Sequence, residues 1–227
     1  MTVWDGLLLD CRAVRPDAVI EQVVTEHSEV RADLGDVLGP LVVPDDVLGR
    51  VDRVVGSLGV GPVPVAVICS TGAGGVVALA GRECDDLELV AASSTLRDLD
   101  DLAGNAARVV AAARTLPETI TVHVGLPATP GWQAAAEVVE AAGLSADVGA
   151  DVDQWSLLVE LDLPFVVSDP SLAVGDVIRT VHRLVEGDDG AGPVDPTRIR
   201  RRLRGLWTTD PLRSARELAR WLEATGG

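Results

Sequence analysis

One histidine of the chain lies inside a segment with the alternating pattern of a β-strand, Thr121-Val-His-Val-Gly125. Successive side chains of a strand point to opposite faces, so Val122 and Val124 share one face while Thr121, His123 and Gly125 share the other. If the valines pack against helices, His123 points to the opposite side, where a neutral imidazole could act as a base or a metal ligand. The alternative is a core histidine that is hydrogen-bonded to a neighbouring strand.

Three aspartates come at or just after the ends of two later strand-like runs: Asp147, Asp151 and Asp169. With His123 they could form a His–carboxylate pair or a site for a hard metal ion. Asp169 has a competing role, because it precedes Pro170 and is expected to cap the helix that follows. The residue types therefore predict a catalytic group made of His123, Asp147 and Asp169, with capping as the favoured interpretation of Asp169.

A glycine-rich turn follows the third strand-like run, Ser70-Thr-Gly-Ala-Gly-Gly75. The turn leads into a helix and could present backbone N–H groups to a phosphate or carboxylate through Ser70, Thr71, Gly72, Gly74 and Gly75. Its spacing matches neither the dinucleotide-binding nor the P-loop pattern. A tight structural turn is the favoured alternative to an anion or cofactor site.

A run of arginines near the C-terminus places five of the nineteen arginines within seven positions: Arg198, Arg200, Arg201, Arg202 and Arg204. Such a patch could bind an anionic ligand or a partner, although pairing with acidic loops of the same chain is the favoured interpretation. Trp207 and Trp221 lie nearby in sequence. Because Trp is enriched at the centres of interfaces, a homodimer through this C-terminal region is a hypothesis.

Two residue types are absent, and this excludes several reactions. The chain has no Lys and no Tyr. It can therefore form neither a lysine Schiff base nor a pyridoxal-phosphate linkage, it lacks a P-loop lysine, and it has no phenolic acid or base.

Cys11, Cys69 and Cys84 are widely spaced without a CxxC pair, so we expect small buried side chains rather than disulfides or a zinc site. No cofactor is indicated.

The formal net charge of −16 repels nucleic-acid backbones, and no basic segment is interleaved with aromatic residues that could stack on bases. No apolar run is long enough to span a membrane, and the first ten residues lack the features of a signal peptide. We therefore expect no nucleic-acid partner, no membrane association and a cytoplasmic location.

Short β-branched or aliphatic runs alternate with stretches of helical periodicity, which is typical of parallel strand–helix units. The predicted strands are 6–11, 41–43, 62–69, 87–92, 119–125, 144–149, 164–168 and a short eighth at 205–208. Three predicted helices are placed by their starts, which lie near Pro16, at Asp45 or Asp46, and at Asp169-Pro170. The other predicted helices span 76–80, 99–113, 132–142, 155–159, 196–204 and 211–224. The polar, glycine-rich segment 186–193 is expected to be a disordered loop.

Eight strands with eight helices is the number that closes a (βα)8 barrel, and 227 residues suit a single barrel domain spanning 1–227. If 205–208 is only a loop, an open doubly wound parallel sheet is the alternative. In a barrel the site is expected at the carboxyl ends of the strands.

Several segments resemble an uncharacterised bacterial family of barrel-type proteins. The resemblance lies in Asp5-Gly-Leu-Leu-Leu-Asp-Cys11, Leu38-Gly-Pro-Leu-Val-Val-Pro44, the alanine-rich middle of the chain, Leu163-Pro-Phe-Val-Val167 and the segment 206–222. It implies a barrel fold and brings no activity with it. Where the family has a Gly-His-His-Pro-like stretch after the seventh strand, this chain has Ser168-Asp-Pro-Ser171.

Two classes of function remain open. The first is a barrel that binds a small anionic metabolite at its strand ends, as a lyase, isomerase or hydrolase, with His123 as proton-transfer group and Asp147 or Asp169 beside it. The second is a binding or scaffold protein on a barrel without a catalytic site. Polar side chains converging around His123 would favour the enzyme, and a mouth filled with Val and Leu would favour the scaffold.

Overall fold

The computed structural model describes residues 2–187 and 195–225. In these residues, parallel strands alternate with helices along the chain. The strands are β1 (Leu8–Asp10), β2 (Leu38–Pro44), β3 (Val63–Cys69), β4 (Leu87–Thr95), β5 (Thr121–Gly125), β6 (Ser145–Val148), β7 (Phe165–Val167) and β8 (Leu203–Thr208). The α-helices are α1 (Ile20–Leu34), α2 (Leu48–Leu58), α3 (Ala73–Ala80), α4 (Leu102–Ala113), α5 (Trp132–Ala141), α6 (Val152–Glu160), α7 (Val174–Glu186), α8 (Pro196–Arg202) and α9 (Pro211–Thr225). Most of the segment 186–193, predicted to be disordered, lies outside the described residues.

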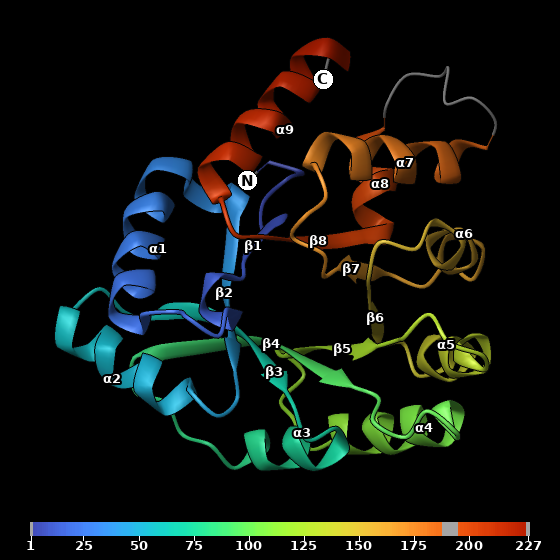
Figure 1. The fold of residues 1–227 in the computed structure, drawn as a ribbon, viewed down its shortest axis with the longest axis horizontal. Helices are drawn as coiled ribbons and strands as arrows, with labels where there is room; N and C mark the ends of the chain where they lie inside the picture. Colours follow the sequence, from blue (N-terminus) through green and yellow to red (C-terminus); the bar gives the residue numbers. More distant parts are fainter. Residues whose placement is uncertain (1, 188–194, 226–227) are drawn as a thin grey trace.

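The strands form a closed ring in chain order, and β8 closes it by pairing in parallel with β7 and with β1. Leu9 lies opposite Trp207 across the β1–β8 seam, and Val167 lies opposite Leu206 on the other side of β8. The helices surround this ring (Figure 1). The chain is a (βα)8 barrel as predicted, and the alternative of an open doubly wound sheet is wrong.

Three strands are longer than their sequence patterns indicated: β2, which was expected at 41–43 and spans Leu38–Pro44, and also β4 and β8. β4 continues to Thr95 because Ser93 and Ser94 remain in register with both β3 and β5. β8 begins at Leu203, opposite Phe165, so α8 ends at Arg202 and Arg204 is a strand residue rather than a helical one. For β4 and β8, hydrogen bonds to neighbouring strands extend the strand through polar residues, an effect that local propensity does not contain.

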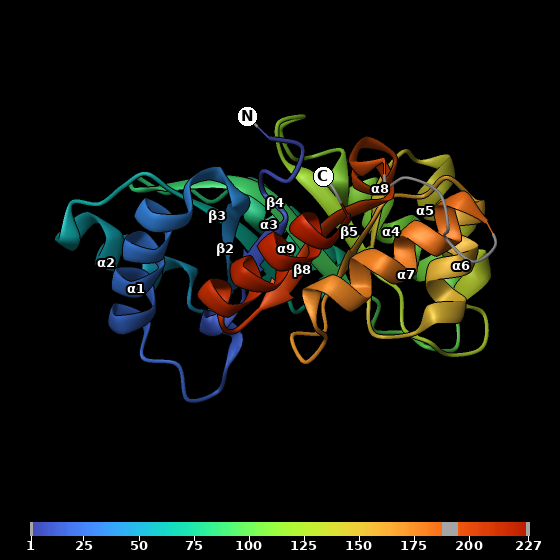
Figure 2. The same ribbon diagram turned by 90° about the horizontal axis from the view of Figure 1, so that it is seen from above.

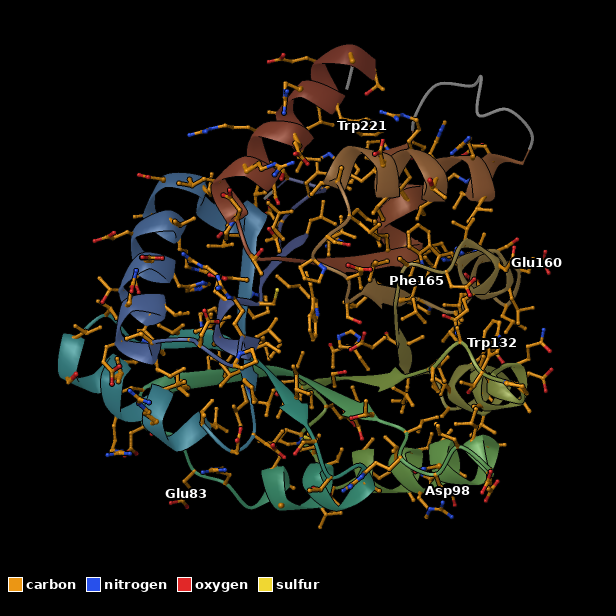
Figure 3. The ribbon with its side chains drawn as sticks, in the orientation of Figure 1. Glu83, Asp98, Trp132, Glu160, Phe165 and Trp221 are labelled. Atoms are coloured by element: carbon orange, nitrogen blue, oxygen red, sulfur yellow. The ribbon has the colours of Figure 1, made fainter. Side chains whose placement is uncertain are left out.

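The outward faces of the strands pack against the helices in one apolar layer. Val122 and Val124 of β5 are buried on this side, as the alternation predicted. Phe165 of β7 stacks on Trp155 of α6, with ring centroids 6.4 Å apart. Figure 3 shows Phe165 inside the ring of helices and Trp221 on α9 next to α7. This layer holds the strands in place, and through them the residues that face the barrel interior.

The two ends of the barrel differ in which segments surround them. In Figure 2 the N-terminus of the chain lies at one end, and the connection from β1 to α1 projects at the other. Among the described residues, no helix is both long and apolar enough to cross a membrane.

Candidate functional site

The barrel interior contains a cavity of ≈ 480 Å³. Barrels of this kind are normally filled by layers of bulky side chains from alternate strands. Here several positions that line the interior carry small side chains, namely Ala66, Ala91, Ser93 and Ser145. Because these side chains leave space that the remaining aliphatic residues do not fill, the barrel can hold a small molecule.

One wall of this cavity is polar and comes from three neighbouring strands. His123 of β5 lies opposite Ser93 of β4 and Ser145 of β6, and Asp147 of β6 lies opposite Gly125. All four polar residues, Ser93, His123, Ser145 and Asp147, line the cavity. The structure therefore brings two of the three predicted catalytic residues, His123 and Asp147, to the same wall.

His123 is nearly enclosed, with 9% of its surface exposed, and its Nδ1 atom is buried without a hydrogen-bond partner. Burial, and secondarily the positive charge of Arg204, lower the pKa of His123 to about 4. The imidazole is therefore neutral at physiological pH. A neutral imidazole carries one ring nitrogen with a free lone pair that can accept a proton.

Asp147 is the carboxyl group of the cavity, and 9% of its surface is exposed. Ser93 Oγ donates a hydrogen bond of 2.5 Å to Asp147 Oδ2, while Asp147 Oδ1 is buried without a partner. Burial raises the pKa of Asp147 above its ordinary value, and the nearby Ser168 and Ser93 hydroxyls oppose this rise only in part. Asp147 is thus more readily protonated than an exposed aspartate.

The rest of the lining is largely apolar and includes Leu9, Val42, Ala66, Ala91 and Val166. A smaller cavity of ≈ 240 Å³ lies at the carboxyl ends of the strands and shares Ile68, Ser93, Asp147 and Trp207 with the larger one. The two cavities are therefore adjacent along the barrel, with these four residues between them.

Asp169 and Asp151 lie outside both cavities. Asp169 Oδ1 accepts hydrogen bonds from the backbone N–H (2.9 Å) and the hydroxyl (2.6 Å) of Ser171. The expectation that Asp169 caps the following helix is wrong, because α7 starts only at Val174 and its N-cap is Ala173. Asp151 caps α6 by accepting hydrogen bonds from the backbone of Asp153 and Gln154.

The glycine-rich turn after β3 begins α3, with Gly72 at its N-cap in a positive-φ conformation (67°). Both the backbone N–H and the hydroxyl of Ser70 donate to the carboxylate of Asp45. That carboxylate also lies close to Gly75, where an added Cβ would be 3.4 Å from Asp45 Oδ2. A carboxylate of the chain itself thus occupies the place where Ser70, Thr71 and Gly75 would meet an anion.

A buried carboxylate outside the cavity, that of Asp10, lies at the end of β1 on the side facing α1. Asp10 Oδ2 is 2.9 Å from His27 Nδ1, and Arg12 binds both carboxylate oxygens of Asp10. Although burial opposes it, hydrogen bonds from His27 and Arg12 hold the pKa of Asp10 below its ordinary value. This network ties α1 to β1, and its atoms do not line the barrel cavity.

The cysteines do not provide a nucleophile. Burial, with a further effect from Asp10, raises the pKa of Cys11 to about 12, and burial beside Asp45 raises that of Cys69 to about 12. In the parts of the chain that the structure describes, no three His, Cys, Asp or Glu side chains come together in a way that could hold a metal ion. The hard-metal alternative for His123 and the aspartates is therefore not assembled.

Most of the arginine patch pairs within the chain. Arg198 binds Glu186, and Arg201 and Arg202 bind Asp162. Arg200 donates to the carbonyl oxygens of Val3, Leu203, Arg204 and Asp5. These contacts agree with the favoured interpretation of the patch.

The two tryptophans of the homodimer hypothesis are directed inward. Trp221 is buried against Trp4, with ring centroids 5.8 Å apart, and Trp207 lines the barrel cavity. Neither ring forms an exposed anchor. The homodimer stays an untested prediction, and neither Trp207 nor Trp221 is available for the aromatic contact on which it was based.

The sequence interpretation did not place Ser93, Ser145, Arg204 and Trp207 in the site, although all four line the cavity. The alternation beyond Ala91 contained a signal for Ser93, since it lies two residues after Ala91 and hence on the same face. Arg204 had no such signal, because a helical assignment put it among surface arginines.

No protein-family model matches this chain, and no curated protein is similar to it. Solved structures, in contrast, share its fold. DHPS of Yersinia pestis matches with a TM-score of 0.54 at 13% identity, over 100% of this chain and 96% of that chain. The dihydropteroate synthase of Xanthomonas albilineans, solved with 7,8-dihydropteroate, matches with a TM-score of 0.51 at 15% identity, over 100% and 96%.

At these identities the likeness shows the fold alone. The protein belongs to the class of (βα)8 barrels, and the neighbours within this class are enzymes. Any activity must be argued from the cavity.

Proposed function

We propose that this barrel is an enzyme that transfers protons on a small organic molecule bound inside the barrel. His123 acts as general base and Asp147 as proton donor. The observation that carries this proposal is a roomy cavity whose polar wall holds two buried titratable side chains, His123 and Asp147, from neighbouring strands. Their buried atoms His123 Nδ1 and Asp147 Oδ1 have no hydrogen-bond partner, so neither side chain has a full set of contacts within the chain.

The protonation preferences of the two groups are complementary. A neutral His123 can take a proton from an acidic C–H or O–H of the ligand, which forms the N–H bond and leaves the electron pair on the ligand. Asp147 in its protonated form can deliver a proton to another atom of the same ligand, and the Ser93 hydroxyl then stabilises the carboxylate. Exchange with water restores both groups. Isomerases and lyases share this step.

The test is deuterium incorporation. Small carboxylate and phosphate metabolites are incubated with the protein in D₂O, and NMR follows the loss of their C–H signals. We expect a substrate whose exchange falls by about 100-fold or more in His123→Asn and in Asp147→Asn, the usual contribution of a general acid or base. Asp151→Asn is the matched control, because Asp151 caps α6 outside the cavity and its loss should leave the exchange rate unchanged.

A non-catalytic binding protein is the second candidate, and one observation favours it. The described residues that line the cavity form one side-chain hydrogen bond among themselves, between Ser93 and Asp147. His123 takes no part in it, so no chain of hydrogen bonds is in place to carry a proton to or from the imidazole. A metabolite that binds without deuterium exchange would support this candidate and reject the enzyme. Exchange that persists in both active-site variants would reject the roles of His123 and Asp147.

A further inference from the structure

The cavity inside the barrel reaches the end of the barrel opposite to the one where barrel enzymes normally bind their substrates. Its lining includes residues at the N-terminal ends of the strands or just before them, namely Gly6, Pro40, Thr121, Gly143, Pro164 and Arg204. Thr121, Gly143 and Arg204 are exposed to solvent. We call this ring of six residues the lower mouth. It lies at the end of the barrel where the N-terminus of the chain is found (Figure 2).

Arg204 is the cation of the lower mouth. Its four neighbours in the arginine patch bind carboxylates or backbone carbonyls, whereas in the described ranges 2–187 and 195–225 the Arg204 side chain has neither an ion pair nor a hydrogen bond. Its guanidinium is therefore available to a ligand anion at the entrance of the cavity, since guanidinium groups bind carboxylates and phosphates with two parallel hydrogen bonds.

A second guanidinium strengthens the positive potential at this point. Arg200 Nη1 donates a 2.8 Å hydrogen bond to the backbone carbonyl of Arg204, so the two residues lie close together. Burial, together with the charge of Arg204, lowers the pKa of Arg200 to about 10. Arg200 uses its donors on carbonyl oxygens of the chain. Arg204 is therefore the group that remains available to a ligand.

Beyond the lower mouth the cavity is apolar on one side and polar on the other. Leu9, Val42, Ala66, Ala91 and Val166 would contact a hydrocarbon body, while the wall with His123 and Asp147 would meet a polar group farther along the ligand. Asp147 is the one carboxyl group among the described residues that line the cavity. It lies at the far end of the chamber, near the carboxyl ends of the strands.

We propose that the lower mouth is a subsite for the anionic group of an amphipathic organic acid, held by Arg204, with the apolar body of the ligand inside the barrel. This inference rests on the proposed function and names its substrate class. The ligand then lies along the barrel axis, with its anionic end at the lower mouth and its polar, reacting part beside His123 and Asp147.

Octanoate and 1-octanol are suitable probes, because they share an apolar chain and differ in the charge of one end. Binding of each is measured by titration calorimetry, at constant ionic strength and neutral pH. A charge-assisted hydrogen bond is worth about 10- to 100-fold in affinity. We expect the wild-type protein to prefer octanoate by about that factor, and Arg204→Gln to lose the preference while its affinity for octanol is unchanged.

Two control variants accompany this substitution. Arg204→Lys keeps the charge and should retain a preference for octanoate. Arg201→Gln removes the same charge three positions away, from an arginine paired with Asp162, and should behave as the wild type. The inference is overturned if Arg204→Gln keeps the preference, if the wild type does not distinguish the two probes, or if neither probe binds at millimolar concentration.

Failure of this inference and failure of the proposed function are distinguishable. The octanoate preference depends on Arg204 and is read from binding, whereas proton transfer depends on His123 and Asp147 and is read from deuterium exchange. Selective binding without exchange would keep the subsite and reject the enzyme. Exchange with a substrate that is insensitive to Arg204→Gln would keep the enzyme and reject the subsite.

Discussion

His123, like His27 and His182, is buried, but it is the one of the three histidines that lines the barrel cavity. Its side chain is almost completely removed from water, and its Nδ1 atom has no hydrogen-bond partner. A buried polar atom left unpaired costs about 1–3 kcal/mol. His27 and His182 also have a buried ring nitrogen without a partner, so it is the position on the cavity wall that distinguishes His123.

The first prediction concerns the pH dependence of stability. The pKa of His123 is about 4 in the folded chain, against 6.5 as the ordinary value. Between these two pH values the unfolded chain binds a proton at His123 and the folded chain does not, so the free energy of unfolding falls as the pH falls. This residue alone should account for a loss of roughly 3 kcal/mol across the window.

The measurement is urea denaturation at pH values from 4.5 to 7.5, for the wild type and His123→Gln. Gln does not titrate, so the variant should lose less stability on acidification than the wild type over this range. Parallel curves for the two proteins would mean that His123 titrates normally, and the burial argument would then be wrong.

At the scale of single residues, the sequence predicted the direction of a side chain better than its hydrogen-bond partners. The alternation of Thr121-Val-His-Val-Gly125 placed His123 on the inward face, and the position of Asp147 near a strand end placed it close by. The missing partners of both side chains could not be predicted, because they depend on which residues the neighbouring strands bring into register. Asp169 shows the same limit, since its Ser171 contact replaced the expected cap.

At the scale of elements, α3 offers two adjacent glycines in contrasting surroundings. A Cβ added at Gly75 would lie 2.9 Å from Cys69 Cβ and 2.9 Å from Thr71 Oγ1, whereas one added at Gly74 would meet nothing within 4 Å. The first glycine is required by the close approach of α3 to the end of β3. The second has no such constraint.

We predict opposite effects of alanine at these two positions. Gly75→Ala should destabilise the protein by about 1–3 kcal/mol, because the Cys69 Cβ is fixed to the backbone of β3 and cannot move aside alone. Gly74→Ala should be neutral or stabilise by up to about 1 kcal/mol, since alanine restricts the unfolded chain more than glycine does. Chemical denaturation of both variants is the measurement, and similar effects at the two positions would contradict the packing described for the turn.

The existence and order of the elements were predictable from periodicity, but the ends of β2, β4 and β8 were not, since all three strands are longer than expected. Ser93 and Arg204 both belong to strands and both line the cavity, although their polarity indicated a loop and a helix. Their strand conformation arises from pairing with β3 and β5 for β4, and with β7 and β1 for β8. Tertiary pairing therefore decided the positions of two residues that matter for the site.

At the scale of the whole molecule, the closed barrel followed from the number of strand–helix units, and the eighth strand was the uncertain step. The hollow interior did not follow, because it results from small side chains that several strands contribute to the inside of the ring. The position of the cavity, with Arg204 and Asp147 both in its lining, is likewise a property of the assembled ring.

The central claim, that the barrel interior is a chamber for a small molecule, is tested most directly by filling it. Ala91 lines the cavity and is buried, whereas Ala80 at the end of α3 is exposed, so Ala91→Phe and Ala80→Phe form a matched pair. Thermal denaturation of both variants and the wild type is measured against amphipathic carboxylates and phosphates. A ligand at 100 times its dissociation constant stabilises the native state by about 2.7 kcal/mol.

We predict that Ala91→Phe folds with little loss of stability, because the ring enters existing space, and that it no longer responds to ligands that stabilise the wild type and Ala80→Phe. In a filled core the same substitution would cost about 1–3 kcal/mol or more. Severe destabilisation by Ala91→Phe, or ligand stabilisation equal to that of the wild type, would contradict the claim.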